Sequence, residues 1–128
     1  MPPTKQNKRH KTMQTTIFNS KTTTTEQRRA AVDKYLEQVR YISEETRAVI
    51  YFILERDYYY DVLEQFATDE ATRAAFSCYV FYYARHLVRE CVKNAVPSVK
   101  HDRCDAIIHG YIRDAARYLF EMITASNK

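Results

Sequence analysis

The sequence is short of the residues that build tight turns. Its 128 residues include one glycine, Gly110, and three prolines, Pro2, Pro3 and Pro97. Hairpins and phosphate-binding loops depend on glycine for backbone conformations that other residues rarely adopt. The scarcity of turn residues argues against a hairpin-based sheet and a glycine-rich nucleotide site, and it predicts an all-α protein.

Long apolar runs and paired cysteines are also missing. No stretch approaches the roughly 18 uncharged apolar residues that cross a bilayer, and the N-terminus lacks the apolar core of a secretory signal. Cys78, Cys91 and Cys104 are an odd number without a close pair, which favours reduced thiols. We expect an intracellular protein in a reducing compartment, the cytoplasm or the nucleus, with no membrane partner.

Acidic residues are absent from the first 25 positions. This segment carries five Lys or Arg and has a charge of +5, whereas residues 26–128 hold 15 basic and 16 acidic residues, a charge of −1. The segment is rich in Thr and Lys and poor in apolar side chains, so it cannot bury enough surface to offset the entropy of ordering. We predict a flexible, disordered basic arm over residues 1–25 and a helical domain over residues 26–128.

The domain contains apolar residues at helical spacing, interrupted by helix-start residues. Thr24 with Gln27 matches a capping box, and Ser43 and Asp69 each precede a further apolar pattern. Pro97 ends the longest pattern. The sequence therefore predicts five helices, over residues 26–41, 44–55, 57–67, 69–95 and 102–124.

Individual helices have further expected features. Residues 48–54 are apolar on every side and are predicted to be the most buried segment, while Arg28 belongs to the polar side of the first helix. Arg56 interrupts an apolar stripe, which predicts a break near residues 55–58. The helix over 69–95 has a broad stripe that includes Tyr83 and Leu87, so we expect it to be the central packing element.

These elements predict a single helical bundle of four or five helices that follows the arm. The alternative is a histone-like helical dimer, because a long helix between shorter ones has that proportion. Dimerisation would then be obligatory. The nearly neutral domain lacks the strong positive charge of a nucleosomal protein.

Two rows of basic residues follow predicted helices at a spacing of four, which places each row on one face. Tyr82 projects from the sector of the first row, and aligned cations with an interleaved aromatic suit a phosphate backbone and a stacked base. The alternative is an ordinary solvated face that pairs with neighbouring acids. The rows are Arg85, Arg89 and Lys93 on the long helix and His109, Arg113 and Arg117 on the last. The residues predicted to bind RNA or DNA are Lys5, Lys8, Arg9, Lys11, Arg85, Arg89, Lys93, Arg113 and Arg117.

The arm has other interpretations. Its KQNKRHK stretch also fits a nuclear-import signal or a soluble tail. Its lack of acids and its many hydroxyls fit a mitochondrial presequence, although such presequences are usually arginine-rich and amphipathic.

Tyrosine is the most unusual part of the composition, with eleven Tyr and no Trp. One core of this size does not satisfy so many hydroxyls, so several rings should reach the surface. In the stretch RDYYYD, Tyr59 and Tyr60 fall on the apolar face and Tyr58 points away from it. We predict that Tyr58, Tyr79 and Tyr82 bind another protein or a second copy of the chain; alternatively they pack on other helices of the same bundle.

Catalytic and metal-binding patterns are weak. Cys91, His101, Cys104 and His109 surround the Pro97 turn, but the cysteines lie on apolar stripes and no Cys-x-x-Cys pair supports a zinc site. No Gly-x-Ser-x-Gly or His-Glu-x-x-His motif occurs. We therefore predict no metal site, no cofactor and no enzymatic activity. The expected function is that of a non-catalytic binding protein, either for nucleic acid or as a helical protein-interaction module or self-associating subunit.

Overall fold

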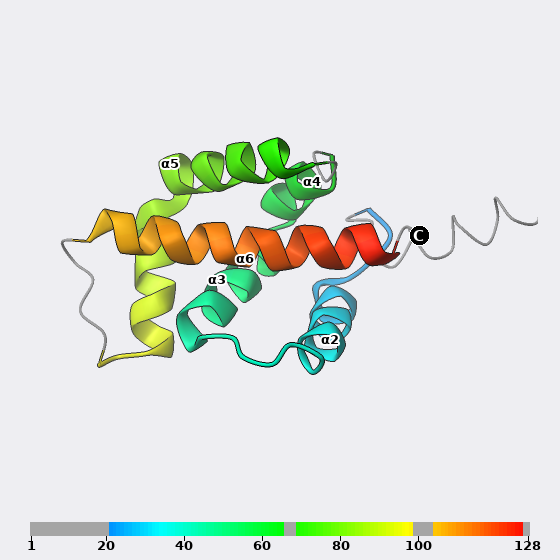
Figure 1. Cartoon of the computed structure of the whole chain (residues 1–128), viewed down its shortest axis with the longest axis horizontal. Coiled ribbons are helices and arrows are strands. Elements are labelled where there is room, and N and C mark those ends of the chain that lie inside the picture. Colours follow the sequence, from blue (N-terminus) through cyan, green and yellow to red (C-terminus); the bar gives the residue numbers. More distant parts are fainter. Residues whose placement is uncertain (1–20, 66–68, 99–103, 127–128) are drawn as a thin grey trace, which may run out of the picture.

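A computed structural model of the chain describes residues 21–65, 69–98 and 104–126. This part of the chain contains five α-helices and no strand, which confirms the all-α prediction (Figure 1). The first twenty residues of the predicted arm lie outside the described residues. The helices are α2 (Thr25–Leu36), α3 (Glu44–Glu55), α4 (Asp57–Gln65), α5 (Glu70–Ala95) and α6 (Asp105–Ser126).

The predicted cap residues begin the first two helices. The backbone N–H of Gln27 donates to the Thr24 hydroxyl at 3.1 Å. In return, the side-chain oxygen of Gln27 accepts from the backbone N–H of Thr24 at 2.9 Å, which completes the capping box. At the start of α3, the Ser43 hydroxyl accepts from the Thr46 amide at 3.1 Å. These bonds satisfy amides that have no partner within the helix, and so they fix where each helix starts.

The first helix is shorter than its apolar pattern indicated. α2 ends at Leu36 rather than at residue 41. Val39 and Ile42, which extend the pattern, still pack against the core as half-buried residues of an irregular segment. The chain must turn before the Ser43 cap of α3, so these two side chains are buried without helical backbone. Periodicity therefore located the core contacts correctly but placed the helix end wrongly.

The central packing element is α3, not the long helix α5 as predicted. α3 contacts all four other helices, whereas α5 packs mainly on α6 and α3 (Figure 1). The physical reason lies in residues 48–54, which are buried as predicted except for the half-buried Tyr51. A helix that is apolar on all sides can be covered only if neighbours surround it. One continuous core joins buried side chains from all five helices.

The predicted break near residues 55–58 is confirmed. α3 ends at Glu55, Arg56 adopts an extended backbone with φ −114° and ψ 101°, and α4 begins at Asp57. The last carbonyls of a helix lack partners within it. Here the Ile53 carbonyl accepts from the Arg56 amide at 3.3 Å, and the Leu54 carbonyl is left for a side chain from elsewhere.

That side chain is Arg28, which was predicted to lie on the polar side of α2 but is fully buried. Its guanidinium donates to the Leu54 carbonyl at 3.3 Å and pairs with the Asp57 carboxylate. It also lies over the Tyr60 ring, 4.5 Å from the centroid. Arg28 thus ties α2 to the α3–α4 junction. The prediction was wrong because the partners are created by the helix break, far away in sequence.

The described helices also bear on membrane insertion. None of them is both long enough and apolar enough to span a bilayer. α6 has 22 residues, about the number that a span requires, but its sequence includes several charged side chains. These are Asp105, Arg113, Asp114, Arg117 and Glu121.

Candidate functional site

The outer side of α4 and α5 carries a continuous cluster of tyrosine rings. We call it the tyrosine face and define it as Tyr58, Tyr59, Tyr79, Tyr82 and Tyr83. Ring centroids lie 6.3 Å apart for Tyr58 and Tyr79, 5.0 Å for Tyr79 and Tyr83, and 6.2 Å for Tyr82 and Tyr83. Tyr58, Tyr82 and Tyr83 are 64%, 74% and 72% exposed. A contiguous group of large rings exposed to solvent is unusual on a protein surface that has no binding partner.

The stretch RDYYYD supplies one edge of this face. Since α4 begins at Asp57, the three following rings diverge by about 100° per residue. Tyr60 enters the core with no exposed surface, Tyr59 is half-buried against Phe52 at 5.9 Å, and Tyr58 is left outside. The predicted exposure of Tyr58 is confirmed, as is that of Tyr82.

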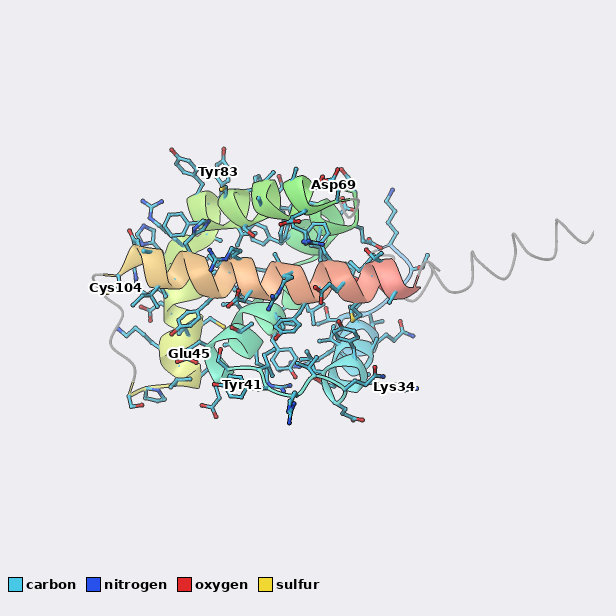
Figure 2. All side chains as sticks on the ribbon, in the orientation of Figure 1. Lys34, Tyr41, Glu45, Asp69, Tyr83 and Cys104 are labelled. Atoms are coloured by element: carbon cyan, nitrogen blue, oxygen red, sulfur yellow. The ribbon has the colours of Figure 1, made fainter. Side chains whose placement is uncertain are left out.

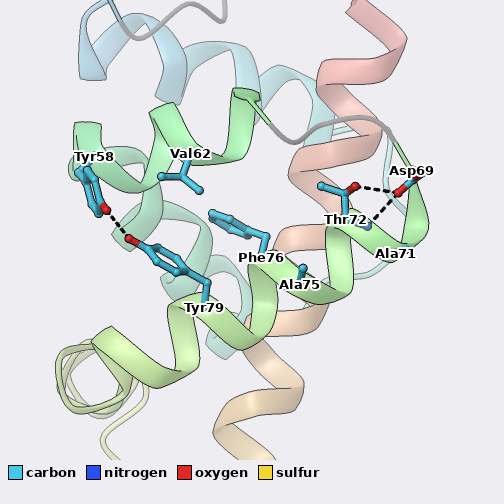
Figure 3. Close-up of a pocket in the computed structure, with 8 residues that line it drawn as sticks. All are labelled: Tyr58, Val62, Asp69, Ala71, Thr72, Ala75, Phe76 and Tyr79. Atoms are coloured by element: carbon cyan, nitrogen blue, oxygen red, sulfur yellow. Dashed lines mark hydrogen bonds between the residues drawn. The ribbon is translucent and has the colours of Figure 1, made fainter.

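A hydrogen bond joins the two helices across the face. The Tyr79 hydroxyl donates to the Tyr58 hydroxyl over 2.5 Å (Figure 3). Burial among its neighbours raises the pKa of Tyr79 to about 12, and the bond to Tyr58 acts in the same direction. A tyrosine keeps its proton at neutral pH even at its ordinary pKa of about 10, and the raised pKa extends this protonated, donating state into alkaline solution. Tyr79 is half-buried, so it serves the face as a fixed inner ring rather than a projecting one.

Beside these rings lies a groove of about 650 Å³ between α4 and α5. Phe76, only 2% exposed, forms its floor and points toward Val62 of α4 (Figure 3). At one end the Asp69 carboxylate accepts from the Thr72 amide and hydroxyl at 2.8 and 2.7 Å. These two bonds hold the pKa of Asp69 below its usual range. The full lining is Tyr58, Val62, Asp69, Ala71, Thr72, Ala75, Phe76 and Tyr79.

Comparisons with known proteins identify no relative. No family model matches the chain, and neither the curated proteins nor the solved structures contain a match. Function must therefore be argued from the chain's own residues.

Sequence reasoning placed two exposed residues of α5 in the core. Tyr83 and Leu87 were assigned to the buried stripe of the long helix, but they are 72% and 52% exposed. α5 buries a narrower line of residues spaced four apart, Val80, Ala84 and Val88. The signal was present in the sequence, because an apolar stripe of nearly half the circumference is wider than the core contact of one helix.

The first basic row is less available than its spacing suggested. Arg89 pairs with Asp105, and its side chain is only 19% exposed. Arg85 is half-buried, donates to the Tyr82 carbonyl at 3.3 Å and lies 5.9 Å from the Phe81 ring. Lys93 is exposed. Arg89 is therefore engaged by α6, Arg85 makes contacts within α5, and Lys93 is the most exposed of the three cations.

The second row is more exposed. The Arg113 side chain is 68% exposed with Asp114 at 4.0 Å, and Arg117 is exposed above the Tyr118 ring at 5.1 Å. His109 turns instead toward α5, where its ring meets Phe81 edge-on at 5.0 Å. The four predicted arm contacts lie outside the described residues: Lys5, Lys8, Arg9 and Lys11.

Three of the four predicted zinc-site candidates, Cys91, Cys104 and His109, are described by the structure. Cys91 donates to the Ala48 carbonyl at 3.4 Å, and burial raises the pKa of its thiol. Cys104 is half-buried, and the His109 Nε2 atom lies 4.0 Å from the sulfur of Cys78, not of Cys91 or Cys104. His101 lies outside the described residues. Within the described ranges no three His, Cys, Asp or Glu side chains could hold a metal ion together.

Proposed function

We propose that this chain is a non-catalytic binding protein that recognises another protein through the tyrosine face and its groove. The observation that carries the proposal is the exposure of Tyr58, Tyr82 and Tyr83, each above 60%, next to an apolar groove of about 650 Å³. Tyrosine contributes large contact area at little entropic cost and keeps a hydroxyl for hydrogen bonds, so it is enriched at protein interfaces.

The charge around the groove favours a protein partner over nucleic acid. α4 carries three acidic residues and no basic one, and Asp69 with Glu70 adds two more acids at the start of α5. A phosphate backbone would be repelled at this surface, since nucleic-acid binding depends on cations that neutralise phosphates. An exposed ring such as Tyr58 could stack on a base, but the acidic residues of α4 around it would repel the phosphates attached to that base.

Replacing Tyr82 by serine is expected to weaken capture of protein partners from the native source by about tenfold or more, as for an interface anchor. Tyr41→Ser is the matched control, because Tyr41 is 76% exposed and lies at the opposite edge of the molecule from Tyr83 (Figure 2). The measurement is titrated pull-down after nuclease treatment. Equal capture by the Tyr82→Ser and Tyr41→Ser proteins, both folded by circular dichroism, would contradict the proposal.

Nucleic-acid binding is a second candidate function, favoured by the +5 charge of residues 1–25 and by the exposed Arg113 and Arg117. RNA or DNA would then contact the arm and the outer side of α6. Arg113 and Arg117 lie on α6, whereas the tyrosine face belongs to α4 and α5, so the two functions are compatible.

Neutralising the arm tests this second candidate in the full chain. Changing Lys5, Lys8, Arg9 and Lys11 together to glutamine is expected to reduce the slope of log K against log salt by about 3 to 4 for duplex DNA, since each phosphate contact contributes about 0.9. Fluorescence anisotropy with labelled RNA and DNA provides the measurement. An unchanged slope, or no binding even at low salt, would rule out the arm as the contact.

A further inference from the structure

The three cysteines of the chain differ in their access to solvent. Cys78 is exposed, whereas Cys91 and Cys104 are half-buried. The Cys91 sulfur also donates to the Ala48 carbonyl at 3.4 Å, and burial raises the pKa of its thiol. The thiolate is the nucleophile in thiol chemistry, and it must also be reached by its reactant. The structure therefore distinguishes Cys78 from the other two thiols.

A histidine lies next to the Cys78 thiol. α5 and α6 pack side by side (Figure 1), and the Nε2 atom of His109 on α6 lies 4.0 Å from the Cys78 sulfur on α5. The His109 ring packs edge-on against Phe81, with 5.0 Å between the ring centroids, which holds the imidazole in position. An imidazole nitrogen beside a thiol can accept its proton and so generate the thiolate.

A small cavity opens beside this thiol and imidazole. Its volume is about 260 Å³, and the residues that line it are Cys78, Phe81, Tyr82, Asp105, Ala106 and His109. Pockets for small ligands usually measure about 300–1,000 Å³. This cavity is therefore suited to a small molecule, or to one end of it, and not to a segment of protein. Both reactive groups border the space that such a molecule would enter.

The charges around the cavity favour an anionic reactant. Arg85 donates to the Tyr82 carbonyl at 3.3 Å and lies 5.9 Å from the centre of the Phe81 ring, so its cation is close to two lining residues. The carboxylate of Asp105 is paired with Arg89, which offsets its negative charge. Positive surroundings stabilise a thiolate and attract anions from solution.

We propose that Cys78 is a modification site that forms a mixed disulfide with a small anionic disulfide. The Cys78 proton passes to Nε2 of His109, and the Cys78 thiolate attacks one sulfur of the reactant. The S–S bond of the reactant breaks as the new S–S bond forms, and the departing thiolate keeps the electron pair and takes the proton from His109. The reactant is reduced to one free thiol while Cys78 is oxidised, so no other oxidant is needed. The reaction requires no protein partner and is independent of the proposed function.

The rate of modification at each cysteine tests the site. The full chain is treated with oxidised glutathione at pH 7, its remaining thiols are blocked, and mass spectrometry of the tryptic peptides measures the added mass. Each cysteine lies in its own tryptic peptide, over residues 74–85, 90–93 and 104–113. In the folded chain Cys78 is expected to react about tenfold faster than the other two, and in urea at a similar rate to them. Equal rates in the folded chain overturn the proposal.

His109→Gln separates the role of the imidazole from that of solvent exposure. Glutamine is polar but does not accept the thiol proton, so modification of Cys78 at pH 7 is expected to slow about fivefold. The difference from the wild-type chain should shrink above about pH 8.5, because an ordinary thiol ionises there without a neighbouring base. A purely structural effect of the substitution would persist at that pH. An unchanged rate at pH 7 in a chain that is folded by circular dichroism overturns the role of His109.

Arg85→Gln tests the preference for an anion. This variant is expected to slow the reaction with oxidised glutathione about threefold, and to slow the reaction with the uncharged 2-hydroxyethyl disulfide less. Arg117→Gln is the matched control, because Arg117 is an exposed arginine about 12 Å along α6 from His109. If Arg85→Gln changes both reactions equally, or no more than Arg117→Gln does, the assignment of an anionic reactant is overturned.

Discussion

Replacing Phe120 by alanine is expected to lower the free energy of unfolding by about 3–5 kcal/mol, the usual cost of deleting a buried aromatic ring. Phe120 is 1% exposed and packs edge-on against Phe76 with 5.9 Å between the ring centroids. Its loss removes apolar burial, leaves a cavity and breaks an aromatic pair. A domain of this size has a total stability of about 5–15 kcal/mol, so this loss is a substantial fraction of the total.

Urea denaturation followed by circular dichroism measures this effect. Phe120→Leu keeps most of the volume and should cost about 1–2 kcal/mol. Tyr41→Ala removes a ring that is 76% exposed and should change stability by about 0.5 kcal/mol or less. Similar losses for Phe120→Ala and Tyr41→Ala would mean that α5 and α6 do not pack through this ring pair.

Replacing Phe120 is also expected to change the groove, because Phe76 forms the groove floor and packs against Phe120. Phe76 is held between Phe120 on the core side and the groove on the other. Loosening Phe120 therefore alters the shape of the groove without changing any residue that a partner would touch. Core packing, in this fold, also maintains the proposed binding surface.

Replacing Arg28 by alanine is expected to cost about 2–4 kcal/mol, within the range for buried side chains that lose both volume and hydrogen bonds. Arg28→Met should leave stability nearly unchanged or raise it, because an apolar side chain of similar length often replaces a buried ion without loss. Two Arg28 nitrogens, Nε and Nη1, are buried without a partner, and methionine removes that penalty. The Asp57 carboxylate is 73% exposed and stays solvated when the guanidinium is gone.

The denaturation midpoints of these variants distinguish the effect of losing the volume of the Arg28 side chain from the effect of losing its charge. Asp57→Asn should be milder than Arg28→Ala, since Arg28 keeps the Leu54 carbonyl and the Tyr60 ring. If Arg28→Met is as damaging as Arg28→Ala, then the ionic contact rather than the packed side chain holds α2 to the α3–α4 junction.

Local features of the fold could be read from the sequence because they depend on neighbouring residues alone. Thr24 and Ser43 cap their helices through contacts three residues away. Residues 48–54 had to be buried, because they are apolar on every side of the helix. Any side left uncovered would expose apolar residues to water. Tyr58 had to leave the core, because Tyr60 occupied the apolar side of the same helix.

Features that depend on distant elements were read less well. Periodicity gave the width of the apolar stripe on α5 but could not say how much of it α6 and α3 would cover, so Tyr83 and Leu87 were placed inside. The pairing of Arg89 with Asp105 joins α5 to α6, and it removed one cation from a row that looked continuous from its spacing alone.

The sequence by itself determined the all-α class, the approximate positions of five helices and the existence of surplus tyrosines that must reach the surface. Only the tertiary structure decided that α3 is the centre, that Arg28 is buried and that the tyrosines of α4 and α5 form one face beside a groove. The reason is that helix formation follows from contacts three or four residues apart, whereas the side of a helix left exposed depends on which other helices arrive to cover it.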